Sequence, residues 1–160
     1  MTRQRCLPPI IDERARVLIL GSFPSEASLA AQHYYAHRQN QFWRVLAAIL
    51  GQPLLEADYV AKQAAVRAAG LAIWDVYAAC EREGSLDTAI RAGEPNRFER
   101  LKRLAPVLTR VCFNGRAAAR FEPTLSALGY QTLVLPSTSP ANAGWSFERK
   151  LEAWRQALTG

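Results

Sequence analysis

The chain has 160 residues, of which 49% are hydrophobic and 21% charged, a composition typical of one globular domain with a real core. Its formal net charge of +6 and its pI of about 9.7 favour a polyanionic partner, with nucleic acid as the first candidate. No apolar run is long enough for a membrane span and the N-terminus lacks the apolar core of a signal peptide, so we expect a cytoplasmic protein with no membrane partner.

In chain order, the first half of the sequence predicts a strand, a long loop, two helices and a second strand, at residues 16–20, 22–36, 40–50, 58–69 and 71–77. Gly21 ends the first strand, and Gly51 and Gly70 end the two helices. The first helix carries Phe42 and Trp43 at the start of an apolar face.

The second half predicts a loop with a short helical turn, then a helix, a strand, a helix, a strand, a loop and a last helix, at residues 78–91, 98–104, 107–113, 116–128, 131–135, 136–144 and 146–158. Pro123 could split the fourth helix, and Ser146 is a candidate N-cap of the last one. We therefore expect an α/β fold: a single three-layer α/β/α domain over residues 1–160, with a central, mainly parallel four-stranded sheet and residues 1–13 as an N-terminal extension.

Polar loops follow all four predicted strands, at residues 21–40, 75–88, 114–116 and 136–145. The carboxyl ends of parallel strands meet at one edge of a sheet, where open α/β sheets bind their ligands. We therefore expect these loops to form one cleft. Tyrosine, histidine, arginine and asparagine in the first loop suit a flat aromatic ligand with hydrogen-bonding edges and a phosphate nearby.

The cysteines and histidines give no pattern of a metal site. Cys6, Cys80 and Cys112 are widely spaced and include no CxxC pair, which disfavours a zinc ribbon, an iron–sulfur cluster and a disulfide framework. His33 and His37 are four residues apart but have no evident third ligand. We therefore expect neither a metal nor another cofactor.

Several sequence motifs stand at the predicted strand ends: Gly21-Ser-Phe-Pro24, Tyr34-Tyr-Ala-His37, Asn40-Gln-Phe-Trp43, Leu71-Ala-Ile-Trp-Asp-Val76, Cys80-Glu-Arg-Glu-Gly-Ser-Leu-Asp87, Phe113-Asn-Gly115 and Leu135-Pro-Ser-Thr-Ser-Pro-Ala-Asn-Ala143. Together they resemble the uracil-DNA glycosylase superfamily over about residues 14–158. Within it they are most similar to the hypoxanthine (deoxyinosine) DNA glycosylase branch, which is related to the mismatch-specific uracil/thymine glycosylases.

The resemblance implies a monofunctional DNA glycosylase of base-excision repair. Such an enzyme turns a deaminated nucleotide out of the duplex and hydrolyses its N-glycosidic bond. Hypoxanthine is the first expected base and uracil the second. The expected partner is double-stranded DNA containing the deaminated base, and we expect a monomer.

The resemblance also implies roles for individual residues. Better-known branches hold the attacking water with an acidic residue or asparagine just after the motif glycine, where this chain has Ser22 and Phe23. The deoxyinosine branch relies instead on an asparagine at the helix start, which Asn40 matches; the alternative is that Asn40 only caps the helix. The expected base-binding residues are Gly21, Ser22, Phe23, Tyr35, Asp75 and Asn114, and the expected DNA-binding residues are Ser137, Thr138, Ser139 and Asn142, with Ala141 to Ala143 near the gap left by the base.

Each of these roles has a structural alternative. Tyr35 could cap the core, Asp75 could cap the turn after its strand, and the 137–142 loop could be a solvated turn. Basic side chains that could attract the phosphate backbone, or simply form a solvated helix face, are Arg38, Arg44, Arg116, Arg120, Arg149 and Lys150.

Two other functions stay open. Because Ser22 and Phe23 replace the usual water-holding residue, the chain could be a nucleic-acid-binding module without catalysis. It could also be a small nucleotide-binding α/β protein, although neither glycine-rich phosphate-binding motif occurs.

Overall fold

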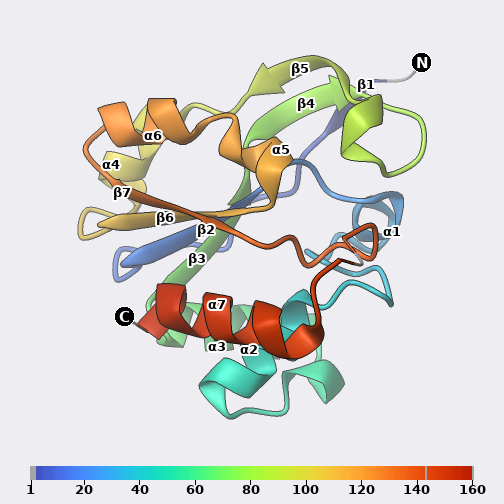
Figure 1. Cartoon of the computed structure of the whole chain (residues 1–160). Helices are drawn as coiled ribbons and strands as arrows, with labels where there is room; N and C mark the ends of the chain where they lie inside the picture. Colours follow the sequence, from blue (N-terminus) through green and yellow to red (C-terminus); the bar gives the residue numbers. More distant parts are fainter. Residues whose placement is uncertain (1–2, 143, 160) are drawn as a thin grey trace.

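The fold is described from a computed structural model, which covers residues 3–142 and 144–159. Four parallel strands form the central sheet in the order β3-β2-β6-β7 (Figure 1). Their bounds are Leu71–Asp75, Val17–Gly21, Arg110–Asn114 and Gln131–Leu135, respectively. Gly21 pairs with Asp75 in register and Asn114 pairs with Leu135, so the carboxyl ends of all four strands lie at the same edge.

Helices cover both faces of this sheet, as Figure 1 shows. One face carries α2 (Phe42–Leu50), α3 (Tyr59–Ala68) and α7 (Phe147–Thr159), and the other carries α4 (Leu101–Leu104), α5 (Arg116–Ala119) and α6 (Glu122–Ala127). Short 3-10 turns lie at Leu54–Glu56, Asp87–Ala89 and Phe98–Arg100. The expected three-layer α/β/α architecture with a parallel four-stranded sheet is confirmed.

The hydrophobic core has two halves because side chains alternate along buried strands. Leu18 and Leu20 point to the half that contains Phe98 and Leu125. Ile19, between them, points to the half that contains Phe42, Trp43 and Trp154. The two core halves fix the sheet between its helices, and with it the edge where the polar loops emerge.

A second sheet was not predicted. The sequence pattern predicts that the second strand runs to Tyr77 and that residues 78–91 form a loop, but β4 (Tyr77–Glu81) pairs antiparallel with both β1 (Arg3–Arg5) and β5 (Arg91–Pro95). All five residues of β5 are exposed, so its sequence lacks the apolar alternation that marks a strand. Backbone pairing to β4 holds it in place.

The long loop after β2 is also more regular than expected. It contains α1 (Glu26–Ala31), whose N-cap Ser25 accepts the backbone N–H of Ser28. Farther along, Pro123 lies in the first turn of α6, so the helix predicted for residues 116–128 is indeed two helices. The Ser146 hydroxyl oxygen accepts the Arg149 N–H at 3.2 Å, as a cap of α7 does.

The segment expected to be an N-terminal extension is part of the folded body. Residues 3–5 form β1, and Leu7 and Ile10 are buried in the core. Ile10 exchanges backbone hydrogen bonds with Ile73 of β3. Among the described residues, no helix is long and apolar enough to cross a bilayer.

Candidate active site

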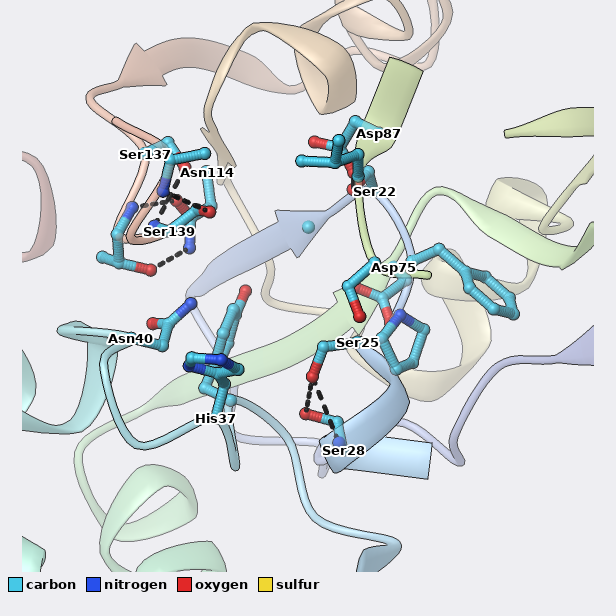
Figure 2. Close-up of a pocket in the computed structure, with 18 of the residues that line it drawn as sticks. Ser22, Ser25, Ser28, His37, Asn40, Asp75, Asp87, Asn114, Ser137 and Ser139 are labelled. Atoms are coloured by element: carbon cyan, nitrogen blue, oxygen red, sulfur yellow. Dashed lines mark hydrogen bonds between the residues drawn. The ribbon is translucent and has the colours of Figure 1, made fainter. Parts of the chain in front are cut away.

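A cavity of about 260 Å³ opens at the carboxyl-terminal edge of the central sheet (Figure 2). All the site residues predicted from the sequence line it except Asn142: they are Gly21, Ser22, Phe23, Tyr35, Asn40, Asp75, Asn114, Ser137, Thr138 and Ser139. The prediction for Ala143 concerns a residue outside the described part of the chain. Loops that are more than 100 residues apart in sequence therefore meet around one space, because parallel strands deliver them to the same edge.

Gly21 lies where two polar side chains approach the backbone closely. A Cβ atom at this position would be 2.7 Å from Asp75 Oδ1 and 3.0 Å from the Tyr35 hydroxyl oxygen. Only a glycine at the end of β2 allows both groups to reach the floor of the cavity.

The carboxyl group of Asp75 is buried at the end of β3 and is 3% exposed. Asn96 donates to the backbone carbonyl of Asp75 at 2.7 Å, whereas the carboxyl atom Oδ2 has no hydrogen-bond partner. Asp75 therefore does not cap the following turn. Burial raises its pKa to about 7; the nearby Asp87 carboxylate adds to this shift and Arg82 opposes it.

Tyr35 presents an aromatic ring and a buried hydroxyl group to the same space. Its ring stacks on Phe42, with centroids 4.1 Å apart and planes inclined by 20°. Its hydroxyl has no hydrogen-bond partner, and burial raises its pKa far above the ordinary range, with the Asp75 carboxyl adding to the shift and the Asn114 amide opposing it. Tyr35 is thus a neutral hydrogen-bonding group at physiological pH.

Asn40 lies just before Gln41, the N-cap of α2, and faces the cavity. Its Oδ1 accepts the backbone N–H of Phe42 at 2.9 Å, and its own backbone N–H donates to the His37 carbonyl at 3.0 Å. These bonds hold the side chain so that the amide nitrogen lies toward the cavity (Figure 2), and none of the described residues accepts a hydrogen bond from it. The hydrogen bond from the Phe42 N–H does not compete with a role in the site, because it orients the amide.

A clamp joins the end of β6 to the loop after β7. Asn114 Oδ1 accepts the Thr138 backbone N–H and Asn114 Nδ2 donates to the Thr138 hydroxyl, both at 3.0 Å. Thr138 is fully buried, and its carbonyl accepts the Gln41 N–H at 3.0 Å. Within the loop, Ser137 Oγ accepts from Ser139 N–H at 3.1 Å. The loop is therefore an ordered turn tied to its neighbours rather than a solvated one.

Lys150 bridges the start of α2 and the loop after β7 through its ammonium group. It was expected on a basic surface, but it is 3% exposed, so that expectation is wrong for this residue. Its Nζ donates to Gln41 Oε1 at 2.9 Å and to the Asn142 carbonyl at 3.0 Å, and burial lowers its pKa. Asn142 in turn donates through Nδ2 to the Ser137 carbonyl at 3.1 Å, so it supports the loop from behind the cavity.

One wall of the cavity has no role assigned from the sequence. It is the segment after β4, where Ser85, Leu86, Asp87 and Thr88 line the space. Ser22 Oγ donates to Asp87 Oδ1 at 2.5 Å, and Leu86 is 61% exposed at the rim. The sequence pattern predicts that the loop at residues 75–88 lies at the cleft, and these four residues do line it, although they reach the cavity after the unpredicted strand β4.

Arg82 lies beneath this wall. It is buried, donates to the Pro24 carbonyl, and has its guanidinium carbon 5.2 Å from the centre of the Phe23 ring. Among residues 3–142 and 144–159, no three His, Cys, Asp or Glu side chains are grouped as metal ligands. His33 instead packs against the Tyr59 ring at a tilt of 33°, with ring centroids 4.2 Å apart.

Comparisons with known proteins agree with this architecture. Residues 8–158 match the family model of the uracil DNA glycosylase superfamily. The chain is 40% identical over 156 residues to a protein of Methanosarcina barkeri named hypoxanthine DNA glycosylase, covering 98% of each chain. It is 42% identical over 149 residues to one of the same name from Methanosarcina acetivorans, covering 93% of this chain and 94% of the relative.

A solved structure gives the same result. The solution NMR structure of a candidate uracil DNA glycosylase from Methanosarcina acetivorans superimposes with a TM-score of 0.88 at 40% sequence identity, covering 98% of this chain and 97% of that one. With the family model and both relatives spanning nearly the whole sequence, the chain belongs to the uracil DNA glycosylase superfamily and is a DNA repair enzyme of the glycosylase type.

Proposed function

We propose that this glycosylase removes hypoxanthine, and secondarily uracil, from double-stranded DNA by hydrolysing the N-glycosidic bond of a nucleotide turned out of the helix. The names of the two Methanosarcina relatives support hypoxanthine as the first substrate. We further propose that the protein is a monomer, consists of a single domain and acts in the cytoplasm.

The observation that carries the proposal is the set of unsatisfied polar groups in the cavity. Asp75 Oδ2 and the Tyr35 hydroxyl are buried without partners, although buried polar groups are nearly always hydrogen-bonded. They lie at the floor of a space that also offers the Tyr35 ring. A flat base with N–H and carbonyl groups at its edge would satisfy these atoms, and a base within the duplex could not reach them.

Asn40 is the proposed catalytic residue. The Phe42 N–H occupies one lone pair of Oδ1, which leaves the other for an attacking water, while Nδ2 can donate to the departing base or the sugar. Hydrolysis through an oxocarbenium-like sugar needs an aligned water and stabilisation of the leaving base more than a strong nucleophile. A fixed carboxamide at the mouth of the cavity supplies both.

The proposed enzyme is monofunctional because no lysine of the described residues lines the cavity. Lys150, which lies behind the 137–142 loop, already donates to two oxygen acceptors and is buried. The serines of that loop are proposed to hold the DNA backbone. Hydroxyl and backbone N–H groups of this kind position a phosphate without reading sequence.

The test is single-turnover release of base from duplex oligonucleotides that carry one deoxyinosine or one deoxyuridine. We expect release from deoxyinosine, with slower release from deoxyuridine, and an abasic product without strand cleavage. No release from either lesion at enzyme excess would refute the proposal.

Two substitutions separate catalysis by Asn40 from helix capping. Asn40→Ser keeps a hydroxyl oxygen that can accept the Phe42 N–H at the start of α2, and Asn40→Ala does not. A catalytic role predicts that both lose at least tenfold in rate, which is about 1.4 kcal/mol of barrier. If Asn40→Ser excised as fast as the wild type while only Asn40→Ala was impaired, capping alone would explain the residue.

A further inference from the structure

The Asp75 carboxyl group is buried, and its Oδ2 atom has no hydrogen-bond partner that would stabilise a charge. No donor among the described residues reaches Asp75 Oδ2. Asp75 also takes part in neither of the ion pairs found among these residues, which join Arg3 to Glu94 and Arg14 to Asp12. An ionised carboxylate in such a place is costly, so the group keeps its proton to a higher pH than an exposed carboxyl group does.

The groups around Asp75 offset the cost of its negative charge only in part, through the attraction of Arg82. Asp87 repels a second negative charge, and Arg82 is directed to the Pro24 carbonyl and the Phe23 ring. The other titratable groups that interact with Asp75 are thiol and phenol groups, which are uncharged at neutral pH and whose pKa values are raised further: Cys6, Tyr34, Tyr35 and Tyr59. Consistently, burial raises the pKa of Asp75 to about 7.

We propose, on the basis of the function proposed above, that Asp75 acts as a neutral carboxylic acid that reads the lactam edge of the base, donating its O–H to the carbonyl oxygen and accepting the adjacent ring N–H. Hypoxanthine and uracil both present this pair. A carboxylic acid kept protonated by an apolar site is an effective hydrogen-bond donor, and a pKa of about 7 leaves about half of the Asp75 carboxyl groups protonated at pH 7. An ionised carboxylate could accept the ring N–H but would repel the neighbouring carbonyl oxygen.

The proposed state makes base recognition depend on pH in a definite direction. Asp75 loses its proton as pH rises through about 7, so recognition of the lactam edge weakens above that pH. Asparagine has the same shape and offers the same donor and acceptor at every pH. Asp75→Asn should therefore retain excision and lose the pH dependence.

The experiment measures single-turnover release of hypoxanthine from duplex DNA between pH 5.5 and 9 for the wild type, Asp75→Asn and Asp87→Asn. We expect the wild-type rate to fall about tenfold per pH unit above its midpoint, as for a single essential acid. Asp75→Asn should stay within about tenfold of the wild type at pH 6, show no fall near pH 7, and exceed the wild type at pH 9. Asp87→Asn should move the wild-type midpoint to lower pH, because it removes a neighbouring negative charge.

A wild-type rate that rises through pH 7, or an unchanged midpoint in Asp75→Asn, would overturn the proposal. Ionisation of the base itself at higher pH affects all variants alike, so the difference between them isolates Asp75.

Infrared spectra of the protein without DNA give a second readout that does not need activity. A protonated carboxyl band should be present at pH 6, lost by pH 9, and absent from Asp75→Asn at both. If neither the wild type nor any variant releases base, the proposed function is wrong, and so is the role of Asp75 in recognising the base. The infrared band still decides whether the Asp75 carboxyl group is neutral.

Discussion

Replacing Gly21 by alanine tests whether the base binds against Asp75 and Tyr35, the two side chains that lie closest to Gly21. The added Cβ would stand 2.7 Å from Asp75 Oδ1 and 3.0 Å from the Tyr35 hydroxyl. To reach 3.4 Å, the lower limit of an ordinary contact, the Asp75 carboxyl must move by about 0.7 Å. Both side chains are held in a packed core, so the strain is shared between them and the strand.

Two magnitudes follow from this displacement. Overpacking of this kind lowers the free energy of unfolding by about 1–3 kcal/mol, which corresponds to a fall in Tm of about 2–4 °C per kcal/mol for a chain of this size. A reacting group misplaced by about 1 Å can cost about 100-fold in rate, so a 0.7 Å shift should cost roughly 10- to 100-fold. We therefore expect a folded Gly21→Ala variant whose single-turnover excision is strongly reduced.

Gly51→Ala is the matched control. Gly51 ends α2 with φ of 66°, and no atom lies within 4 Å of the place that an alanine Cβ would take, so alanine there costs about 1–2 kcal/mol through backbone strain alone. Both variants should lose similar stability by chemical denaturation, but only Gly21→Ala should lose excision. If Gly21→Ala excised as fast as Gly51→Ala, the base would not sit against Asp75 and Tyr35.

Two further predictions concern the buried ionisable groups. Lys150→Met should change the free energy of unfolding by less than about 2 kcal/mol, because loss of a desolvated ammonium offsets the two acceptors left without a donor. Excision should nevertheless fall roughly tenfold, because the 137–142 loop loses the bridge through Lys150 to the Gln41 side chain and keeps only the bond from the Gln41 N–H to the Thr138 carbonyl. Unchanged kinetics would refute this positioning role. Asp75→Asn should be more stable than the wild type at pH 8, by up to about 4 kcal/mol, and this difference should shrink towards pH 4. The reason is that the folded wild type keeps the Asp75 proton up to about pH 7, whereas the unfolded chain releases it near pH 3.8. The stability of the wild type therefore falls as pH rises between these two values. Denaturation curves at both pH values check the sign, and a gap that grows on acidification would contradict it.

The strand ends could be predicted from sequence, and with them most of the cavity. Val17–Gly21 and Arg110–Asn114 are apolar runs that stop at a glycine or asparagine, and parallel pairing then delivers the following residues to one edge. The position of Asn40 at the cavity could be predicted from the order of the motifs along the chain. These features depend on local pattern and on the topology that the pattern allows.

Features that depend on tertiary pairing could not be predicted in this way. Strand β5 has no buried side chain, so only its partner β4 makes it a strand, and the position of Asp87 follows from that pairing. Lys150 did leave a signal: it shares a helix face with Trp154 and Ala157, both buried, which points it inward. The perturbed pKa of Asp75 arises from burial by residues distant in sequence, which no local pattern reports.

The most direct test is a crystal structure of the Asn40→Ala variant bound to a duplex that contains one deoxyinosine. We predict that the hypoxanthine lies outside the helix, in the cavity between Tyr35 and Asp75, with its N–H and carbonyl edge on the Asp75 carboxyl group and the 137–142 loop against the DNA backbone. A hypoxanthine that stays stacked in the duplex, or that binds elsewhere on the protein, would contradict the account.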